Sequence, residues 1–345
     1  MLSVRWFDQW HPALDEAMSG LADLPNCPRT LFRELMQNQD GPRKRIALVL
    51  ERDAAAGIVG IRKRQRHWEV VGVVPRTVND SLDKLITALH IELETWTAAE
   101  PHRRLVRWSY AMPIRKVNLQ SNFEYHWRGS RSLKEALRKG RQRCADMSFE
   151  IDTPGAAEWV LTSWAEKWKG DAAGLSNALP DRLIEARYFE SQGLLHSFVL
   201  KDGDRPIAGL TAFAFDWLAL PNSVGQSIGA VLTVHRVFCS NEYRWHSAGN
   251  RLFDLVFNWA KDNGYEKASL GCNLPYMERW APIDGHFWIF LVAPWHVYAF
   301  KGAARKLTTS SGRYARSIPH PSRGGQPVAA AATDPPKEAS TAMFG

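Results

Sequence analysis

The chain has 345 residues, of which 45% are hydrophobic and 23% are charged, and its formal net charge is +8. This composition excludes disordered, fibrous and collagen-like proteins, and the length favours two globular domains of about 150 residues each. The positive charge favours anionic partners, such as a phosphate-bearing cofactor, an acidic carrier protein, RNA or anionic lipid, against the common alternative of a merely solvated basic surface.

Cysteine spacing, the N-terminus and hydropathy bear on the compartment. The four cysteines lack CxxC or Cys/His spacing, which argues against a metal site and against a disulfide framework. The N-terminal segment MLSVRWFDQWHPALDEAM lacks the apolar stretch of a signal peptide. The most apolar run, residues 286–300, contains Pro294 and is shorter than the roughly 20 residues that span a bilayer. We therefore expect a cytoplasmic protein without a metal and without a transmembrane segment.

The first third of the chain predicts an α+β unit. A short helix is expected over 29–37, and a longer one over 79–96, where apolar residues keep helical spacing after Asn79, a suitable N-cap. Apolar, partly β-branched runs between turn residues predict the strands. These are expected at 45–51, 58–62, 68–74 and 105–110.

A second α+β unit follows a basic amphipathic helix over 131–144. Thr153 and Pro154 are expected to open one helix, and Pro180 another that ends at Gly193. Gly203 supplies the turn of a hairpin, and Ser247 is expected to cap a helix over 248–262. The strands of this unit are expected at 195–200, 207–215, 231–239, 268–271 and 288–292.

The domain organisation follows from these two units. We expect an N-terminal domain over 1–125, a C-terminal domain over 126–310 and a disordered tail over 311–345, where Ser, Gly, Pro and Ala dominate. Each domain is expected to contain a mixed, mostly antiparallel sheet flanked by helices.

The strand at 231–239 followed by Ser247-Ala248-Gly249 carries the clearest chemical signal. A strand that parts from its neighbour and leads to a helix N-terminus leaves a slot with backbone amides, where the positive end of the helix can hold phosphate. An ordinary, well-capped helix is the alternative on spacing alone.

Three runs resemble the GNAT-type domain of bacterial cellulose- and exopolysaccharide-associated acyltransferases of the FemAB-like double-GNAT group. They are LKDGDRPIAG (200–209), SNEYRWHSAGNRLFDLVFNWAKDNGYEKASLG (240–271) and LPYMERWAP (274–282). The basic helix at 131–143 and SWAEKWKGDAAG (163–174) are similar to the upstream parts of that family, so the resemblance covers about 125–305. It implies two tandem GNAT-like domains, the first of them degenerate.

The resemblance implies an acyltransferase that moves an acyl group from a thioester donor, acyl-CoA or an acyl-carrier protein, to an amine or hydroxyl by direct attack. The donor would lie between the third strand of the C-terminal unit and the following helix. Its expected ligands are the residues that open this helix: Ser247, Ala248, Gly249, Asn250 and Arg251.

Direct transfer needs a group that removes the proton of the acceptor and often a second that protonates the leaving thiolate. His235 is the candidate base because its ordinary pKa suits the task, and a packed strand histidine is the alternative. Glu242 is the second candidate base. The resemblance suggests Tyr276 as acid or orienting group, and Asn273 could orient the acceptor. The chain departs from the family at Ser269-Leu270-Gly271, where an acidic residue often precedes the glycine.

Two further functions stay open. The basic helix and the cluster of Arg62, Lys63, Arg64 and Arg66 would suit tRNA, the donor of FemAB-like ligases, although the chain lacks the sustained heptads of their coiled coil. The departure at Ser269 would also fit a catalytically inactive GNAT-fold partner in polysaccharide assembly.

Overall fold

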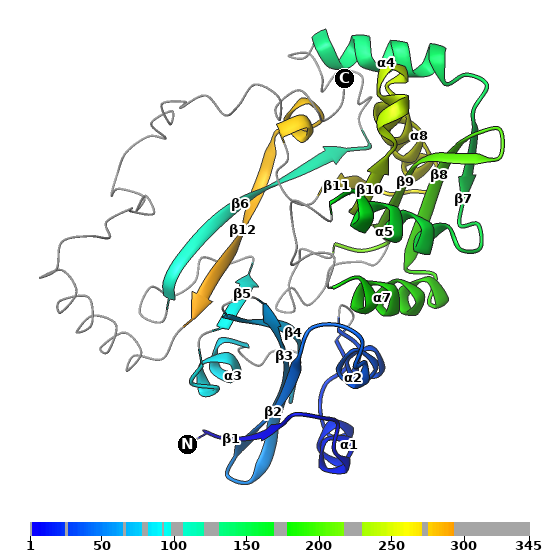
Figure 1. Ribbon diagram of the computed structural model, residues 1–345. Helices are drawn as coiled ribbons and strands as arrows, with labels where there is room; N and C mark the ends of the chain where they lie inside the picture. Colours follow the sequence, from blue (N-terminus) through cyan, green and yellow to red (C-terminus); the bar gives the residue numbers. More distant parts are fainter. Residues whose placement is uncertain are drawn as a thin grey trace, which may run out of the picture.

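The computed structural model describes residues 2–24, 27–64, 67–77, 82–91, 93–97, 106–120, 131–168, 178–216, 230–270 and 275–292. Figure 1 shows the N-terminal elements at the bottom, the helices at 131–143 and 248–262 with the neighbouring strands at the upper right, and two long strands beside them. Among the described residues, no helix combines the length and the apolar character that crossing a membrane requires.

The N-terminal half contains six strands and three helices within the described residues. The strands predicted around 45–51, 58–62 and 68–74 are confirmed, and those beginning near 58 and 105 are longer than expected. The first strand and first helix were not predicted, because both are short. The elements are β1 (Leu2–Phe7), α1 (Pro12–Ser19), α2 (Arg29–Gln37), β2 (Lys44–Glu51), β3 (Ala54–Arg64), β4 (His67–Pro75), α3 (Leu82–Ala88), β5 (Leu93–Thr97) and β6 (Val106–Asn118).

The helix predicted over 79–96 is wrong in its second half. Helix α3 ends at Ala88, His90 has a left-handed φ of 51°, and the chain continues into β5. Leu93 is fully buried on that strand, in the same apolar cluster as Leu85 and Leu89. Leu93 therefore fits the helical spacing of apolar residues although it lies on a strand. The proposed cap, Asn79, lies outside the described residues.

The C-terminal half begins with the predicted basic helix. The turn at Gly203 has a φ of +58°, as its hairpin role requires, and the strand predicted at 231–239 has the expected bounds. The elements are α4 (Arg131–Arg143), β7 (Ser148–Ile151), α5 (Ala156–Lys167), α7 (Leu179–Ser191), β8 (Leu195–Asp202), β9 (Arg205–Phe213), β10 (Val231–Cys239), η2 (Asn241–His246), α8 (Ala248–Asp262), β11 (Lys267–Ser269), η3 (Pro275–Arg279) and β12 (Ile283–Val292).

One predicted helix start in this half is wrong. Thr153 and Pro154 precede α5, which begins at Ala156 after Gly155 in a left-handed conformation with a φ of +80°. The amide of Ala156 donates to the carbonyl of Thr153, so a tight turn occupies the place of the expected first helical turn.

The described strands form one twelve-stranded sheet in the order β1-β2-β3-β4-β5-β12-β6-β11-β10-β9-β8-β7. All neighbours are antiparallel except the parallel pairs β4–β5 and β10–β11. Strand β12, from the end of the described chain, lies between β5 and β6, and β6 also pairs with β11. The α+β class with a mixed, mostly antiparallel sheet flanked by helices is confirmed. The domain boundaries at 125 and 310 stay a prediction.

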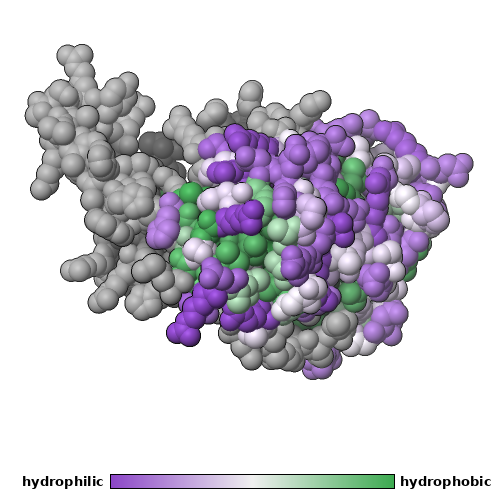
Figure 2. Space-filling model, turned by 90° about the horizontal axis from the view of Figure 1, so that it is seen from below, coloured by the Kyte–Doolittle hydropathy of each residue, from purple (hydrophilic) through white to green (hydrophobic). Residues whose placement is uncertain are grey.

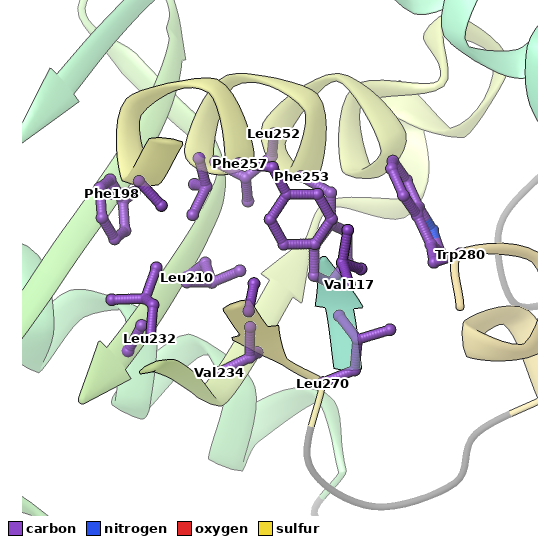
Figure 3. Packing of buried hydrophobic residues seen from close by; sticks show 14 of the residues in the cluster. Val117, Phe198, Leu210, Leu232, Val234, Leu252, Phe253, Phe257, Leu270 and Trp280 are labelled. Carbon is purple, nitrogen blue, oxygen red and sulfur yellow. The ribbon is translucent and has the colours of Figure 1, made fainter. Parts of the chain in front are cut away.

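Helices cover both faces of the C-terminal part of the sheet. On the face that we call the α8 face, Leu252, Phe253 and Phe257 of α8 pack on Leu210 and other strand residues, together with α4 (Figure 3). On the opposite face, which we call the α5 face, α5 and α7 pack with α2 of the N-terminal half. The C-terminal sheet therefore has a buried interior on each side.

A second apolar cluster lies within the N-terminal half. It joins strand residues such as Val49, Val59 and Ile61 to Leu85 and Leu89. Half-buried apolar side chains from β1 pack at its edge. Seen from below, hydrophobic residues gather in one area of a mostly hydrophilic surface (Figure 2).

A buried polar cluster joins the two halves. The carboxylate of Asp181, in the first turn of α7, accepts from Lys44 Nζ at 2.6 Å and from Asn38 Nδ2 at 3.1 Å. Arg62 contacts the other oxygen of Asp181 at 3.4 Å and binds Glu69 at 2.9 Å. We call these five residues the interface cluster. Each of its charges has a partner of opposite sign, so α7 is fixed against β2 and β3 by satisfied interactions.

Candidate functional site

Strands β10 and β11 part after a short parallel pairing. Their register runs from Val231 opposite Lys267 to Thr233 opposite Ser269, and β10 then continues to Cys239 with β9 on its other edge. Within the described residues, the later part of β10 has no strand partner on the β11 side. We call the point beyond Thr233 and Ser269 the fork. The predicted parting of two strands is present.

His235 occupies a β-bulge at the fork. The register with β9 shifts between Val234 and Arg236, so His235 is the extra residue of β10. Its ring lies 4.8 Å from the Phe213 ring, which in turn contacts Phe189 of α7. The imidazole therefore lies on the α5 face, opposite to the neighbouring Val234, which packs on the α8 face.

The imidazole of His235 is neutral near pH 7. Burial, followed by the positive charges of Arg236 and Arg182, lowers its pKa well below the ordinary value. Nδ1 lies 3.5 Å from Thr211 Oγ1, at the limit of hydrogen bonding, and the buried Nε2 has no partner among the described residues. When Nδ1 carries the proton, the lone pair of Nε2 is available as a base.

Ser269 is a second buried polar residue at the fork. Its neighbours Ala268 and Leu270 pack on the α8 face, so its side chain points to the α5 face, as His235 does. Ser269 is fully buried, and within the described part of the chain its Oγ has no hydrogen-bond partner. Sequence reasoning missed this residue as a site candidate, because a serine in a three-residue strand gives no periodic signal.

A lysine from the N-terminal half lies beside Ser269. Lys116 on β6 is the register partner of Ser269, and its Nζ lies 2.7 Å from Asp216 and 3.7 Å from Asp284. Asp216 is 4% exposed. The strands of both halves thus contribute to the fork, and the charge of Lys116 is balanced there.

The sequence predicted that the side chain of Ser247 caps α8, and the structure shows no such cap. Ser247 lies at the N-cap position with a left-handed φ of 56°, and no cap hydrogen bond comes from its side chain. The 3₁₀-helix η2 runs directly into α8, and the amide of Ser247 donates to the carbonyl of Arg244. A capping side chain usually requires an extended backbone at the N-cap, and the left-handed conformation of Ser247 differs from it.

The opening of α8 is covered rather than exposed. Ser247, Ala248, Gly249 and Asn250 are all buried. The backbone of Gly249 lies close enough to the Cys239 thiol to affect its pKa. Helix α4 approaches so closely that a Cβ added at its Gly140 would lie 3.2 Å from the carbonyl oxygen of Ser247. The start of α8 is therefore buried against protein, and the donor-binding role of these residues stays a prediction.

Two arginines share one buried carboxylate next to this opening. Asp254 is fully buried, and Arg141 of α4 binds it through Nε at 2.9 Å and a terminal nitrogen at 2.8 Å. Arg251 binds the same carboxylate at 2.8 Å, and its buried Nε has no partner in the described residues. Both guanidinium groups lie near the positive end of the α8 dipole, where an anion is favoured.

Glu242, the second candidate base, is not brought to His235. Glu242 in η2 is exposed and lies 2.7 Å from Arg205, at the first residue of β9. Thr211, the neighbour of His235, lies six residues beyond Arg205 on β9, a distance of about 20 Å along the strand. The side chain of Tyr276 and all of Asn273 lie outside the described residues, so their roles stay predictions.

The described residues contain no group of three or more His, Cys, Asp or Glu side chains that could hold a metal ion. The arrangement at the fork instead offers a neutral imidazole, a hydroxyl and strand amides. These groups can orient a substrate, accept a proton and stabilise a developing negative charge.

No protein-family model matches this sequence, and no curated protein sequence matches it either. Among solved structures, the chain is similar to a conserved protein of unknown function from Bacteroides thetaiotaomicron, with a TM-score of 0.50, 11% identity, and coverage of 84% of this chain and 100% of that one. This likeness concerns the fold alone.

Two further similar structures have TM-scores below 0.5, so no conclusion rests on them. One is a tandem GNAT protein from the clavulanic acid biosynthesis pathway, with a TM-score of 0.45, 9% identity and coverage of 85% of this chain and 98% of that one. The other is FemX, with a TM-score of 0.44, 9% identity and coverage of 86% and 99%.

Proposed function

We propose that this chain is a GNAT-type acyltransferase that moves an acyl group from a thioester donor to a hydroxyl or amine acceptor at the fork. The observation that carries the proposal is the parting of β10 from β11 at a bulge that presents His235. The sequence resemblance over about 125–305 supports the same reaction class.

The proposed chemistry uses few groups. The edge of β10 beyond Thr233 supplies backbone amides that polarise the thioester carbonyl. The acceptor attacks the carbonyl carbon while His235 Nε2 takes its proton, and the carbon–sulfur bond breaks with its electron pair leaving on sulfur. The thiolate then takes a proton from the imidazolium or from Tyr276, our candidate acid.

The proposed donor is an acyl-CoA or an acyl-carrier-protein thioester. The guanidinium groups of Arg141 and Arg251, together with the positive end of the helix dipole, support binding of its phosphate near the start of α8. Because α4 packs on this opening at Gly140, donor binding there would require a shift of α4.

A panel of acyl-CoAs and acyl-carrier proteins, with thiol release as the readout, tests the proposal. His235→Gln should lower the rate by about 10²- to 10⁴-fold. The matched control is His196→Gln, since His196 is fully hydrogen-bonded to Asp152 and Tyr265. Equal rates in both variants would contradict the role of His235. Absence of donor binding and turnover would instead favour the inactive GNAT-fold partner.

Aminoacyl-tRNA-dependent transfer is the second candidate, and one observation favours it. Trp245 in η2 is 82% exposed, and Arg143 of the basic helix donates to its carbonyl. An exposed aromatic ring beside several cations suits stacking on a nucleic-acid base. tRNA binding that weakens steeply with salt would support this candidate, and binding indifferent to salt would exclude it.

A further inference from the structure

We infer that the acceptor in this reaction is a neutral hydroxyl, held between Ser269 Oγ and the imidazole of His235 on the α5 face of the fork. The enzyme would therefore form esters in preference to amides. This inference rests on the proposed acyl transfer and makes it specific.

The two polar groups are placed to act on one ligand. Ser269 is paired with Thr233, and His235 follows two residues later on the same strand, about 7 Å along it. Both side chains point to the α5 face, and the buried Oγ and Nε2 have no partner in the described residues. Buried polar atoms usually have partners, and these two on one face of adjacent strands can bind the same ligand hydroxyl, Ser269 as donor and the imidazole as acceptor.

The charges around His235 favour a neutral ligand. Arg236 follows it directly, donates to its carbonyl at 2.6 Å and lies 4.7 Å from the centre of the Trp164 ring on α5. Arg182 of α7 is the second cation that acts on the imidazole. The carboxylate of Asp216 is bound to Lys116, and that of Glu185 to Arg182. An ammonium group would meet the guanidinium group of Arg236, whereas the carboxylates of Asp216 and Glu185 already bind Lys116 and Arg182.

Proton transfer favours a hydroxyl for a second reason. An ammonium has no lone pair and must lose a proton before it attacks, whereas a hydroxyl loses its proton while the new carbon–oxygen bond forms. Burial lowers the pKa of His235, which makes the imidazole a poor base toward a free ammonium. In the hydroxyl reaction the proton goes to Nε2 and then to the thiolate, so the products are an ester and a free thiol.

Acetyl-CoA with glycerol or ethylamine at equal concentration and pH 7 tests the inference. We expect acetylglycerol to form at least tenfold faster than the amide of ethylamine. Water is also a neutral hydroxyl acceptor, so acetate is expected to form at least tenfold faster than this amide as well. Hydroxylamine cleaves the ester and spares the amide, which identifies each product. Amide formation faster than ester formation would overturn the inference and leave the proposed function intact. Lack of thiol release with every acceptor would overturn both.

Two serine variants separate binding from structure. Ser269→Ala should raise the KM for glycerol about tenfold or more and change kcat less. Ser197→Ala is the matched control, because Ser197 on β8 is 1% exposed and its Oγ is likewise buried without a partner among the described residues. Thermal unfolding checks that both variants are folded. Equal KM values for the two folded variants would then contradict the role of Ser269.

Discussion

The interface cluster and the fork are both buried and polar, but they differ in how their groups are satisfied. Asp181 holds Lys44, Asn38 and Arg62 in a closed set of contacts. At the fork, Ser269 Oγ and His235 Nε2 have no partner in the described residues. A satisfied polar cluster fixes two elements against each other, whereas unsatisfied atoms are expected where a ligand binds.

The largest effect is expected at the interface cluster. Asp181→Ala leaves Lys44, whose side chain is 6% exposed, as a buried cation without its carboxylate. We expect a loss of about 3–5 kcal/mol in the free energy of unfolding, measured in urea. The control is Asp8→Ala, which removes exposed pairs with Arg43 and Arg45 and should cost less than about 1 kcal/mol. Equal losses would show that the cluster does not join the halves.

The next effect concerns pH. The pKa of His235 is lowered in the folded chain, so the unfolded chain binds a proton first as the pH falls below about 6.5. Stability is complete above that pH and decreases below it, by at most about 1.4 kcal/mol per pH unit. Unfolding curves between pH 5 and 8 should show a shallower decrease for His235→Gln. Identical curves for variant and wild type would contradict a neutral buried imidazole.

A smaller effect on the free energy of unfolding is expected for Ser269 at the fork. Ser269→Ala removes a buried hydroxyl without a described partner, so the free energy of unfolding should stay the same or rise by about 1 kcal/mol. Thermal unfolding measures this change. A loss of more than about 1 kcal/mol would mean that the hydroxyl is satisfied in the folded chain and is not kept for a ligand.

The smallest effect is expected at Glu242. Its exposed pair with Arg205 should contribute about 0–1 kcal/mol to stability. Because this pair lies about 20 Å from Thr211 along β9, Glu242→Gln should leave kcat unchanged. A fall in thiol release as large as that of His235→Gln would restore Glu242 as the base.

The sequence was most informative where signals are local. Strand β10 was predicted with its observed bounds, since it is rich in β-branched residues, and the hairpin turn at Gly203 was predicted from its residue type. The bulge at His235 interrupts the alternation, so that Arg236 shares the α5 face with His235, and this change of side could not be read from the sequence. The placement of β12 between β5 and β6 depends on long-range pairing, which leaves no local pattern.

The site was only partly predictable for the same reason. His235 was selected by residue type, whereas Ser269 became a candidate only once its burial and its neighbours Thr233 and Lys116 were known. The covered start of α8 was also hidden, because it depends on the contact with Gly140 of α4.

A structure of the chain with acetyl-CoA bound tests the central claim most directly. Our account predicts the thioester carbonyl against the free edge of β10 beyond Thr233, with the sulfur near His235 and α4 displaced from Ser247. Donor bound elsewhere, with α4 still packed against Ser247 and the fork filled by protein side chains, would contradict acyl transfer at this site.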